Sequence, residues 1–306
     1  MTQFLFRRSL NAAITVFLIL VLVFVAARIG GDPVSIMFPD GIDPETQAAF
    51  EAQLGLDKPV LVQFSYYMLD LAQGEFGNSI HSRESVIDMY LDRLPATLTL
   101  AALAFVLSVF MGIGLGLIGA LRRNAPSGRL AMSVAFLGYS VPHFVLAILL
   151  IFLFGFVLRT LPTVGNSTPY HYVLPAIVLA AGLTAAIARY TRSVLLDVLS
   201  EDYVRTARSK GLSDQLVHFK HALPNALIPV VTVLGLQLTS LVSGSLIVEE
   251  VFAFRGIGQL LVGSVRDADF PVLQCGVIFF GLAVILINLL VDVLYAVLDP
   301  RVRVAS

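Results

Sequence analysis

A short polar stripe interrupts one apolar run of this 306-residue chain. Gln237, Ser240 and Gly244 recur at i, i+3 and i+7, so they share one face of a helix. Small and polar residues in such a setting either hydrogen-bond to water and polar solutes or let a second helix approach closely. The stripe therefore predicts a wet path or a helix contact, and Thr239 and Ser243, one position away, would widen the lining of a path.

The sequence lacks the residue spacings of common catalytic motifs. There is no HExxH zinc motif and no nucleophile paired with a base, which excludes the common hydrolytic mechanisms. None of the three lysines (Lys58, Lys210, Lys220) ends a glycine-rich phosphate loop, so the chain is predicted to have no ATP site. The histidines form no recognisable metal cluster and the single cysteine forms no disulfide. We expect no catalytic residue, no metal and no cofactor in this chain.

The most charged short stretch, residues 201–212 (EDYVRTARSKGL), carries the end signals of a helix of about two turns. Its predicted N-terminal signals are Ser200 as N-cap followed by Glu201 and Asp202, and its C-terminal ones are Arg208, Lys210 and then Gly211 as a left-handed cap. So short a helix has only marginal stability in water, so contacts with another surface must stabilise it. A second helix is expected to start at Ser213 and Asp214.

One face of the first helix has a tyrosine followed by two nearly bare positions. Tyr203, Ala207 and Gly211 recur every four residues, which would let another surface approach closely. The alternative is a solvated loop whose arginines hold anionic lipid headgroups.

Composition identifies a membrane protein. Hydrophobic residues make up 57% of the chain, charged residues 13%, and the mean hydropathy is +0.86, more than a soluble core can absorb. The net charge of -1 excludes a nucleic-acid partner, and the lipid bilayer is the expected surrounding. The fold class is predicted to be an all-α membrane protein, because apolar spanning helices satisfy their backbone polar groups internally.

Six segments are long and apolar enough to span a bilayer. They are residues 9–29, 95–121, 130–157, 172–195, 225–248 and 272–297. The first is too long for a cleaved signal sequence and is expected to be retained. Within the second, Gly112 and Gly116 have the GxxxG spacing that favours close helix packing.

The distribution of Lys and Arg predicts the orientation. Most basic residues fall on one face of this topology, at residues 7–8, 122–129, 189–220 and 301–303. Both termini are therefore predicted to be cytoplasmic, with residues 30–94 as an extracytoplasmic segment and residues 196–224 as a cytoplasmic loop. Residues 1–306 are expected to form a single transmembrane domain. Within residues 30–94, PVLVQFSYYMLDLAQ predicts an amphipathic helix that either belongs to a small cap or rests on the membrane interface.

The stretch RTARSKGLSDQLVHFKHALP resembles the cytoplasmic loop of binding-protein-dependent ABC importer permeases. The general pattern is Glu-Ala-Ala, three residues, Gly, nine residues, Ile, one residue, Leu-Pro. Positions that match it are Ala207, Gly211, Leu223 and Pro224, whereas Arg205, Thr206 and His221 depart from it. These departures are similar to the dipeptide and oligopeptide (peptide/nickel) branch. LGLDKPVLVQF, DRLPATLTLA, SVPHFVLAILLIFLF, RGIGQLL and NLLVDVLYAVLDPRVR extend the resemblance over nearly the whole chain.

The resemblance implies a permease subunit of a multi-pass importer in the bacterial cytoplasmic (inner) membrane. Its implied partners are a second, homologous permease, two ATPase subunits that bind ATP and Mg, an extracytoplasmic solute-binding protein and a di- or oligopeptide substrate. Nickel or glutathione is the alternative substrate, and a gradient-driven secondary carrier is the alternative function.

The resemblance also implies roles for particular residues. The charged stretch becomes a coupling helix that docks on an ATPase, with the contacts Glu201, Asp202, Tyr203, Arg205, Thr206, Ala207, Arg208, Gly211 and Leu212. It places Glu249, Glu250 and Arg255 at the extracytoplasmic gate, although two carboxylates at a helix end also commonly face water. Asn288 and Asp292 share a face at the cytoplasmic end of the sixth helix, where a structural role is favoured.

Overall fold

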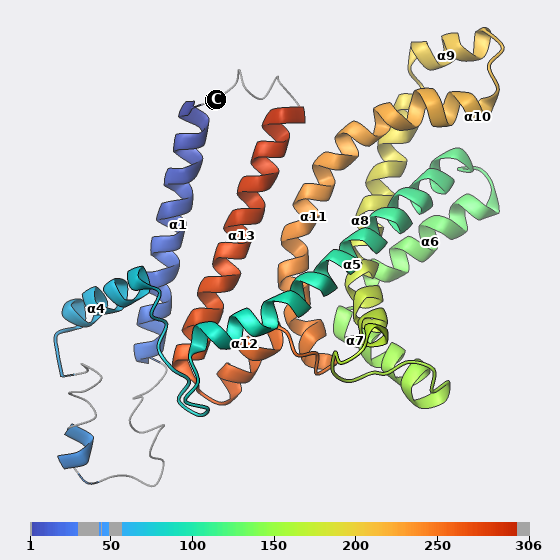
Figure 1. Cartoon of the computed structure of the whole chain (residues 1–306). Coiled ribbons are helices and arrows are strands. Elements are labelled where there is room, and N and C mark those ends of the chain that lie inside the picture. Colours follow the sequence, from blue (N-terminus) through green and yellow to red (C-terminus); the bar gives the residue numbers. More distant parts are fainter. Residues whose placement is uncertain (1, 30–42, 44, 49–56, 299–306) are drawn as a thin grey trace. The chain divides into compact units, whose positions relative to one another are not determined.

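The computed structural model describes residues 2–29, 43, 45–48 and 57–298. Every regular element in this part of the chain is a helix, and Asn78 and Ser85 form an isolated bridge. Beside a helical turn at residues 45–48, the helices are α1 (Thr2–Ile29), α4 (Val60–Gln73), α5 (Val86–Leu121), α6 (Pro126–Ser140), α7 (His143–Leu150), α8 (Val173–Leu199), α9 (Asp202–Ser209), α10 (Asp214–Leu216), α11 (Leu223–Val251), α12 (Ile257–Arg266) and α13 (Phe270–Leu298) (Figure 1). Short stretches of π-helix, Ile151–Val157 and Val217–Ala222, extend α7 and α10, and a 3-10 turn, Pro169–Tyr172, precedes α8. The all-α prediction is confirmed.

Five helices are long and apolar enough to cross a membrane, and a bent pair adds a sixth if it counts as one span. The five lie in α1, α5, α8, α11 and α13, close to the predicted segments. The predicted span 130–157 is wrong as one continuous helix, because α6 and α7 meet at an angle of 104°. Pro142 has no N–H to donate and disfavours helical geometry at Val141, which is extended (φ -94°, ψ 122°).

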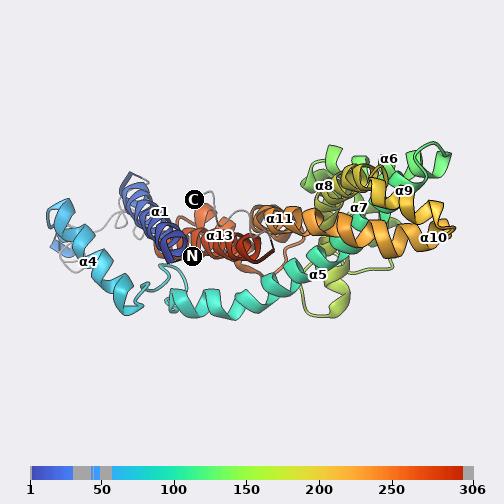
Figure 2. The same cartoon turned by 90° about the horizontal axis from the view of Figure 1, so that it is seen from above.

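The described residues divide into two compact units, the first formed by 96–255 with 284–298 and the second by 2–29, 43, 45–48 and 57–95 with 256–283. In the first unit α8 is the central helix: α6, α7 and α11 lie around it in both views (Figures 1 and 2). Its apolar side chains form the core with those of α5 and α11, among them Leu174, Val178, Ile187, Leu100 and Leu241. This packing makes α8 the scaffold that positions its neighbours. The single-domain prediction stays a prediction.

Two glycines of α5 are in close contact with α8. A Cβ at Gly112 would lie 2.6 Å from Ile187 Cβ, and one at Gly116 would lie 2.6 Å from the Ala188 carbonyl oxygen. The backbones therefore approach too closely for any side chain. The packing role predicted from the GxxxG spacing is confirmed.

The second unit contains the described part of the predicted extracytoplasmic segment. The predicted amphipathic helix is confirmed as α4, none of whose residues is buried. Its Phe64 ring packs edge-on against Phe24 of α1 with ring centroids 5.1 Å apart. The following loop is tied to the α12–α13 turn, where Asp269 accepts hydrogen bonds from Ser79 Oγ (2.5 Å) and Ile80 N (3.3 Å).

Candidate functional site

The break between α6 and α7 opens a cavity of about 400 Å³ in the first unit. Its walls come from the end of α6, the Val141–Pro142 break, the start of α7, and the facing sides of α8 and α11. Polar side chains on this wall are Tyr139, His143, Arg189, Gln237 and Ser240. A cavity in which several polar side chains stand on a mostly apolar lining is the arrangement expected of a solute path.

The predicted stripe on α11 lines this cavity in part. Gln237, Ser240 and Gly244 all face it. Thr239 and Ser243, which were predicted to widen the lining of a path, do not line this cavity. Thr239 Oγ1 donates instead to Asn288 Oδ1 of α13 at 3.2 Å, and Ser243 is exposed outside the cavity. One face of α11 therefore lines the cavity, whereas Thr239 at an adjacent position contacts α13.

His143 occupies a slot between two glycines. A Cβ at Gly182 of α8 would lie 2.9 Å from His143 Nε2, and one at Gly244 of α11 would lie 3.8 Å from His143 Cε1. The stripe's glycine thus makes room for an imidazole. Sequence reasoning did not place His143 in the site, although its position after a helix-breaking proline was the available signal.

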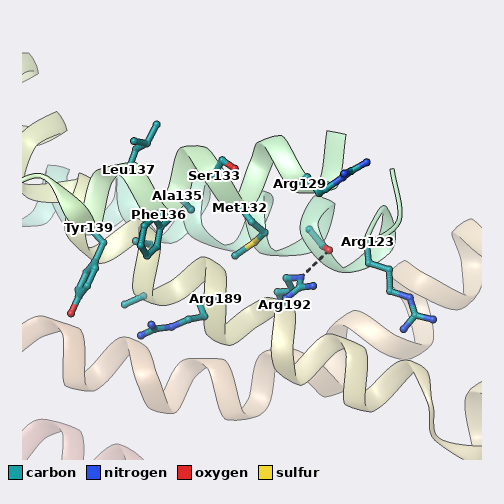
Figure 3. A pocket seen from close by; sticks show the side chains of 14 residues that line it. Arg123, Arg129, Met132, Ser133, Ala135, Phe136, Leu137, Tyr139, Arg189 and Arg192 are labelled. Atoms are coloured by element: carbon teal, nitrogen blue, oxygen red, sulfur yellow. Dashed lines mark hydrogen bonds between the residues drawn. The ribbon is translucent and has the colours of Figure 1, made fainter. Parts of the chain in front are cut away.

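A second cavity, of about 740 Å³, continues from the first along α6 and α8, and the two share Tyr139, Ala186 and Arg189. Figure 3 shows Arg192 of α8 donating through Nε to the Gly119 carbonyl oxygen at 3.1 Å. In the same view Arg189 extends from α8 toward the end of the cavity where Tyr139 lies. Sequence reasoning counted both arginines only as markers of orientation.

The charged stretch forms the short helix α9, with two corrections at its start. Ser200 is not its N-cap: this residue ends α8, and its hydroxyl donates to the Asp197 carbonyl oxygen (2.7 Å). Glu201 is the N-cap in extended geometry, so Asp202 alone is acidic within the first turn. Gly211 has the predicted left-handed conformation (φ +77°), and Ser213 caps α10 as predicted by accepting from Leu216 N (3.4 Å).

An apolar cluster holds α9 in place. Val204 and Ala207 are buried against Val217, with Leu199 and Leu212 packed around them. Ala207 is 7% exposed, so the surface that approaches this bare position belongs to the same chain, and contact of Ala207 with an ATPase stays a prediction. Tyr203 is 42% exposed and its hydroxyl accepts from Asn225 Nδ2 (3.1 Å).

The opposite side of α9 is charged and accessible. Exposed residues there are Glu201, Asp202, Arg205, Thr206, Arg208 and Gly211. The ion pairs Asp202–Arg205 and Arg208–Asp214 (both 3.4 Å) are exposed to water and contribute little stability. In Figure 1, α9 and α10 lie beyond the ends of α8 and α11. The helix thus presents a polar surface on the side away from the apolar cluster.

The two glutamates at the end of α11 are less exposed than expected of carboxylates at a helix end. Glu249 is fully buried and accepts a hydrogen bond from Thr97 Oγ1 (2.8 Å), so it does not face water. Glu250 is half-buried, whereas Arg255 is exposed and its carbonyl oxygen accepts from Asn166 Nδ2 (3.2 Å). Asn288 accepts from Thr239, in keeping with a structural role, and the Asp292 side chain lies outside the described residues.

The sequence matches two models of one transport family. Residues 112–304 match the binding-protein-dependent transport system inner membrane component, and residues 1–101 match the corresponding N-terminal model. The glutathione transport system permease protein GsiC of Escherichia coli is 44% identical over 304 residues, covering 99% of both chains. The same permease of Salmonella typhimurium is 43% identical with the same coverage.

Solved structures agree on the fold. The MetNI methionine ABC transporter, in an inward-facing conformation, matches with a TM-score of 0.59 at 20% identity, over 71% of this chain and 99% of that chain. An amino acid ABC transporter matches with a TM-score of 0.53 at 19% identity, over 68% of this chain and 93% of that chain. The sequence matches and this shared fold show that the chain belongs to the binding-protein-dependent transport system inner membrane component family, as a multi-pass permease subunit of an ABC importer.

Proposed function

We propose that this permease imports peptides, with glutathione as the leading candidate, and that the cavity at the α6–α7 break is part of their path. The cavity carries the proposal, because its polar side chains converge within a unit whose core is apolar. Extensive identity to glutathione permeases supports the substrate class. Alternating access would expose this cavity to one side of the membrane and then to the other.

The topology that fits the fold and the distribution of basic residues best has six membrane crossings and both termini in the cytoplasm. A basic cavity of about 740 Å³ is lined both by the α5–α6 connection and by residues around α9, so these two turns lie at the same end of the first unit. The loop after α7 lies at the other end, because Gly165 N donates to the Phe252 carbonyl oxygen beyond α11 (3.1 Å). This placement supports counting the bent pair as one crossing. The basic residues of the first end then favour its cytoplasmic location, with 196–224 inside and 30–94 outside.

The polar surface of α9 is the proposed coupling element. The charged side chains of α9 are exposed, whereas its apolar side is buried within its own chain. A partner subunit can therefore contact the charged side without disturbing the apolar contacts that hold the helix. The complete importer would contain a second homologous permease, two ATPase subunits that bind ATP and Mg, and an extracytoplasmic solute-binding protein. The family works with ATPase and binding-protein partners in general.

Reconstitution tests the proposal. The tagged chain is purified with the proteins that accompany it, placed in liposomes and supplied with ATP, a binding protein and radiolabelled glutathione. We expect two ATPases and a sister permease in the complex, and uptake that stops when ATP is omitted but resists an uncoupler. ATP-independent uptake by the isolated chain would contradict it, and ATP-driven uptake of other peptides alone would contradict glutathione as substrate.

Replacing Gln237 by leucine tests whether the cavity is wet. Leucine has a similar volume, and Gln237 bonds to no other described residue, so the free energy of unfolding should not fall. Loss of one hydrogen bond to a passing solute should lower uptake roughly fivefold. Ser243→Leu, on the same helix but outside the cavity, is the control. Unchanged uptake together with poorer assembly would indicate that the stripe serves packing.

A further inference from the structure

Arg189 lies in the C-terminal half of α8, a helix long and apolar enough to cross a membrane. It precedes the last residue of α8, Leu199, by ten positions, which is about 15 Å along a helix. Residues 169–199 form one of the candidate spans. An arginine within a span is costly unless it faces a cavity or a partner, and such residues commonly mark solute pathways.

The structure shows a hydrogen-bond partner for the neighbouring Arg192 but none for Arg189 among the described residues. Arg192 donates to the Gly119 carbonyl oxygen, one of the acceptors left open at the end of α5. Arg189 makes no hydrogen bond or ion pair with any residue that the structure describes. Its guanidinium is therefore available, and it is one of three residues that line both cavities.

The surroundings of Arg189 suit an anion. No aspartate or glutamate occurs among the described residues that line the two cavities, whereas Arg123, Arg129 and Arg192 line the larger one. These charges repel cations and attract anions. Beyond Arg189 the smaller cavity offers His143, Gln237 and Ser240, which can hydrogen-bond to the amide groups of a peptide.

We propose that Arg189 binds a free carboxylate of the substrate during passage and thereby selects anionic peptides, such as glutathione, over cationic ones. A guanidinium presents a planar pair of N–H donors that matches both oxygens of a carboxylate. The inference rests on the proposed function, since it concerns a solute within the same path. An anionic lipid headgroup offers similar chemistry to the guanidinium, and the experiment separates the two.

The test uses the complete transporter in liposomes with its binding protein and labelled glutathione. Arg189→Gln should lower uptake roughly ten- to hundredfold, as expected for loss of a charge-assisted bidentate pair. ATP hydrolysis stimulated by the loaded binding protein should stay near the wild-type rate, which a folding defect would not allow. Arg189→Lys, which retains the charge but not the paired donors, should recover part of the uptake. Arg192→Gln is the comparison variant: it should lower the amount of folded protein, and it should lower the uptake per folded transporter less than Arg189→Gln does, because Arg192 lines only the larger cavity and is bonded to Gly119.

Each outcome decides the question. Wild-type uptake by Arg189→Gln, or equal loss in Arg189→Lys, would overturn the role in carboxylate binding. All variants are also measured in liposomes of neutral lipid alone, and a deficit that appears only with anionic lipid would assign Arg189 to the bilayer instead. A wild-type complex that shows no ATP-driven glutathione uptake would refute the proposed substrate and leave the variants' ATPase rates unaffected.

Discussion

Replacing Gly211 by leucine is expected to abolish most transport while leaving the permease inserted and assembled. Gly211 follows α9 with φ +77°, is exposed, and a Cβ there would meet nothing within 4 Å. The new side chain would therefore not clash within this chain, and it would project from the end of the proposed coupling surface. Losing about 1.4 kcal/mol of the contact with an ATPase would weaken that contact tenfold. Uptake and ATP hydrolysis, measured together in liposomes, should show hydrolysis that no longer drives uptake.

Backbone strain needs its own control, because leucine in the left-handed region costs about 1–2 kcal/mol at any site. Gly74, which ends α4, has φ +82° and equally open surroundings. Gly74→Leu carries the same strain away from α9, and it should transport normally. Gly211→Asn, which tolerates this conformation, should retain more coupling than Gly211→Leu. Equal losses in Gly74→Leu and Gly211→Leu would mean that strain, and not docking, explains the effect.

The second large effect is expected at Gly116. A Cβ at this position would lie 2.6 Å from the Ala188 carbonyl oxygen and 2.7 Å from Thr191 Cβ. Backbone of the central helix cannot yield as a flexible side chain can, so Gly116→Val should force α5 and α8 apart. Overpacking of this kind typically costs about 1–3 kcal/mol, and a β-branched residue against a carbonyl group belongs at the upper end.

Gly114 provides the matched control on the same helix. A Cβ there has nothing within 4 Å, so Gly114→Val has the same helix propensity and adds the same side chain without the clash. The free energy of unfolding in detergent should fall for Gly116→Val and remain near wild type for Gly114→Val. Similar losses in both variants would show that glycine at these positions serves helix flexibility and not close packing.

The family assignment also decides between the functions left open by the sequence. A gradient-driven carrier and an ATP-driven importer can have the same hydropathy and the same absence of an ATP loop. Matches to transport-system permeases over nearly the whole chain establish the importer subunit.

Local patterns determined much of this protein without reference to its tertiary structure. Apolar run length sets where helices can cross a bilayer, and the GxxxG spacing identified a close contact, because both depend on neighbours along one helix. The left-handed Gly211 and the Ser213 cap were predictable for the same reason, since caps are satisfied within a turn or two.

Tertiary structure alone decided which polar side chains share a cavity. Gln237 and Thr239 lie on one helix, yet one faces a cavity and the other bonds to Asn288, because the difference depends on which helix packs alongside. Ala207 and Glu249 are buried for the same reason: their burial comes from contacts with distant segments, which periodicity does not encode. The 104° bend at Pro142 brings His143 to Gly182 and Gly244 and places Arg189 on the same wall. A proline in the sequence predicts that a helix will break, but the direction in which the chain continues depends on the helices against which the next segment packs.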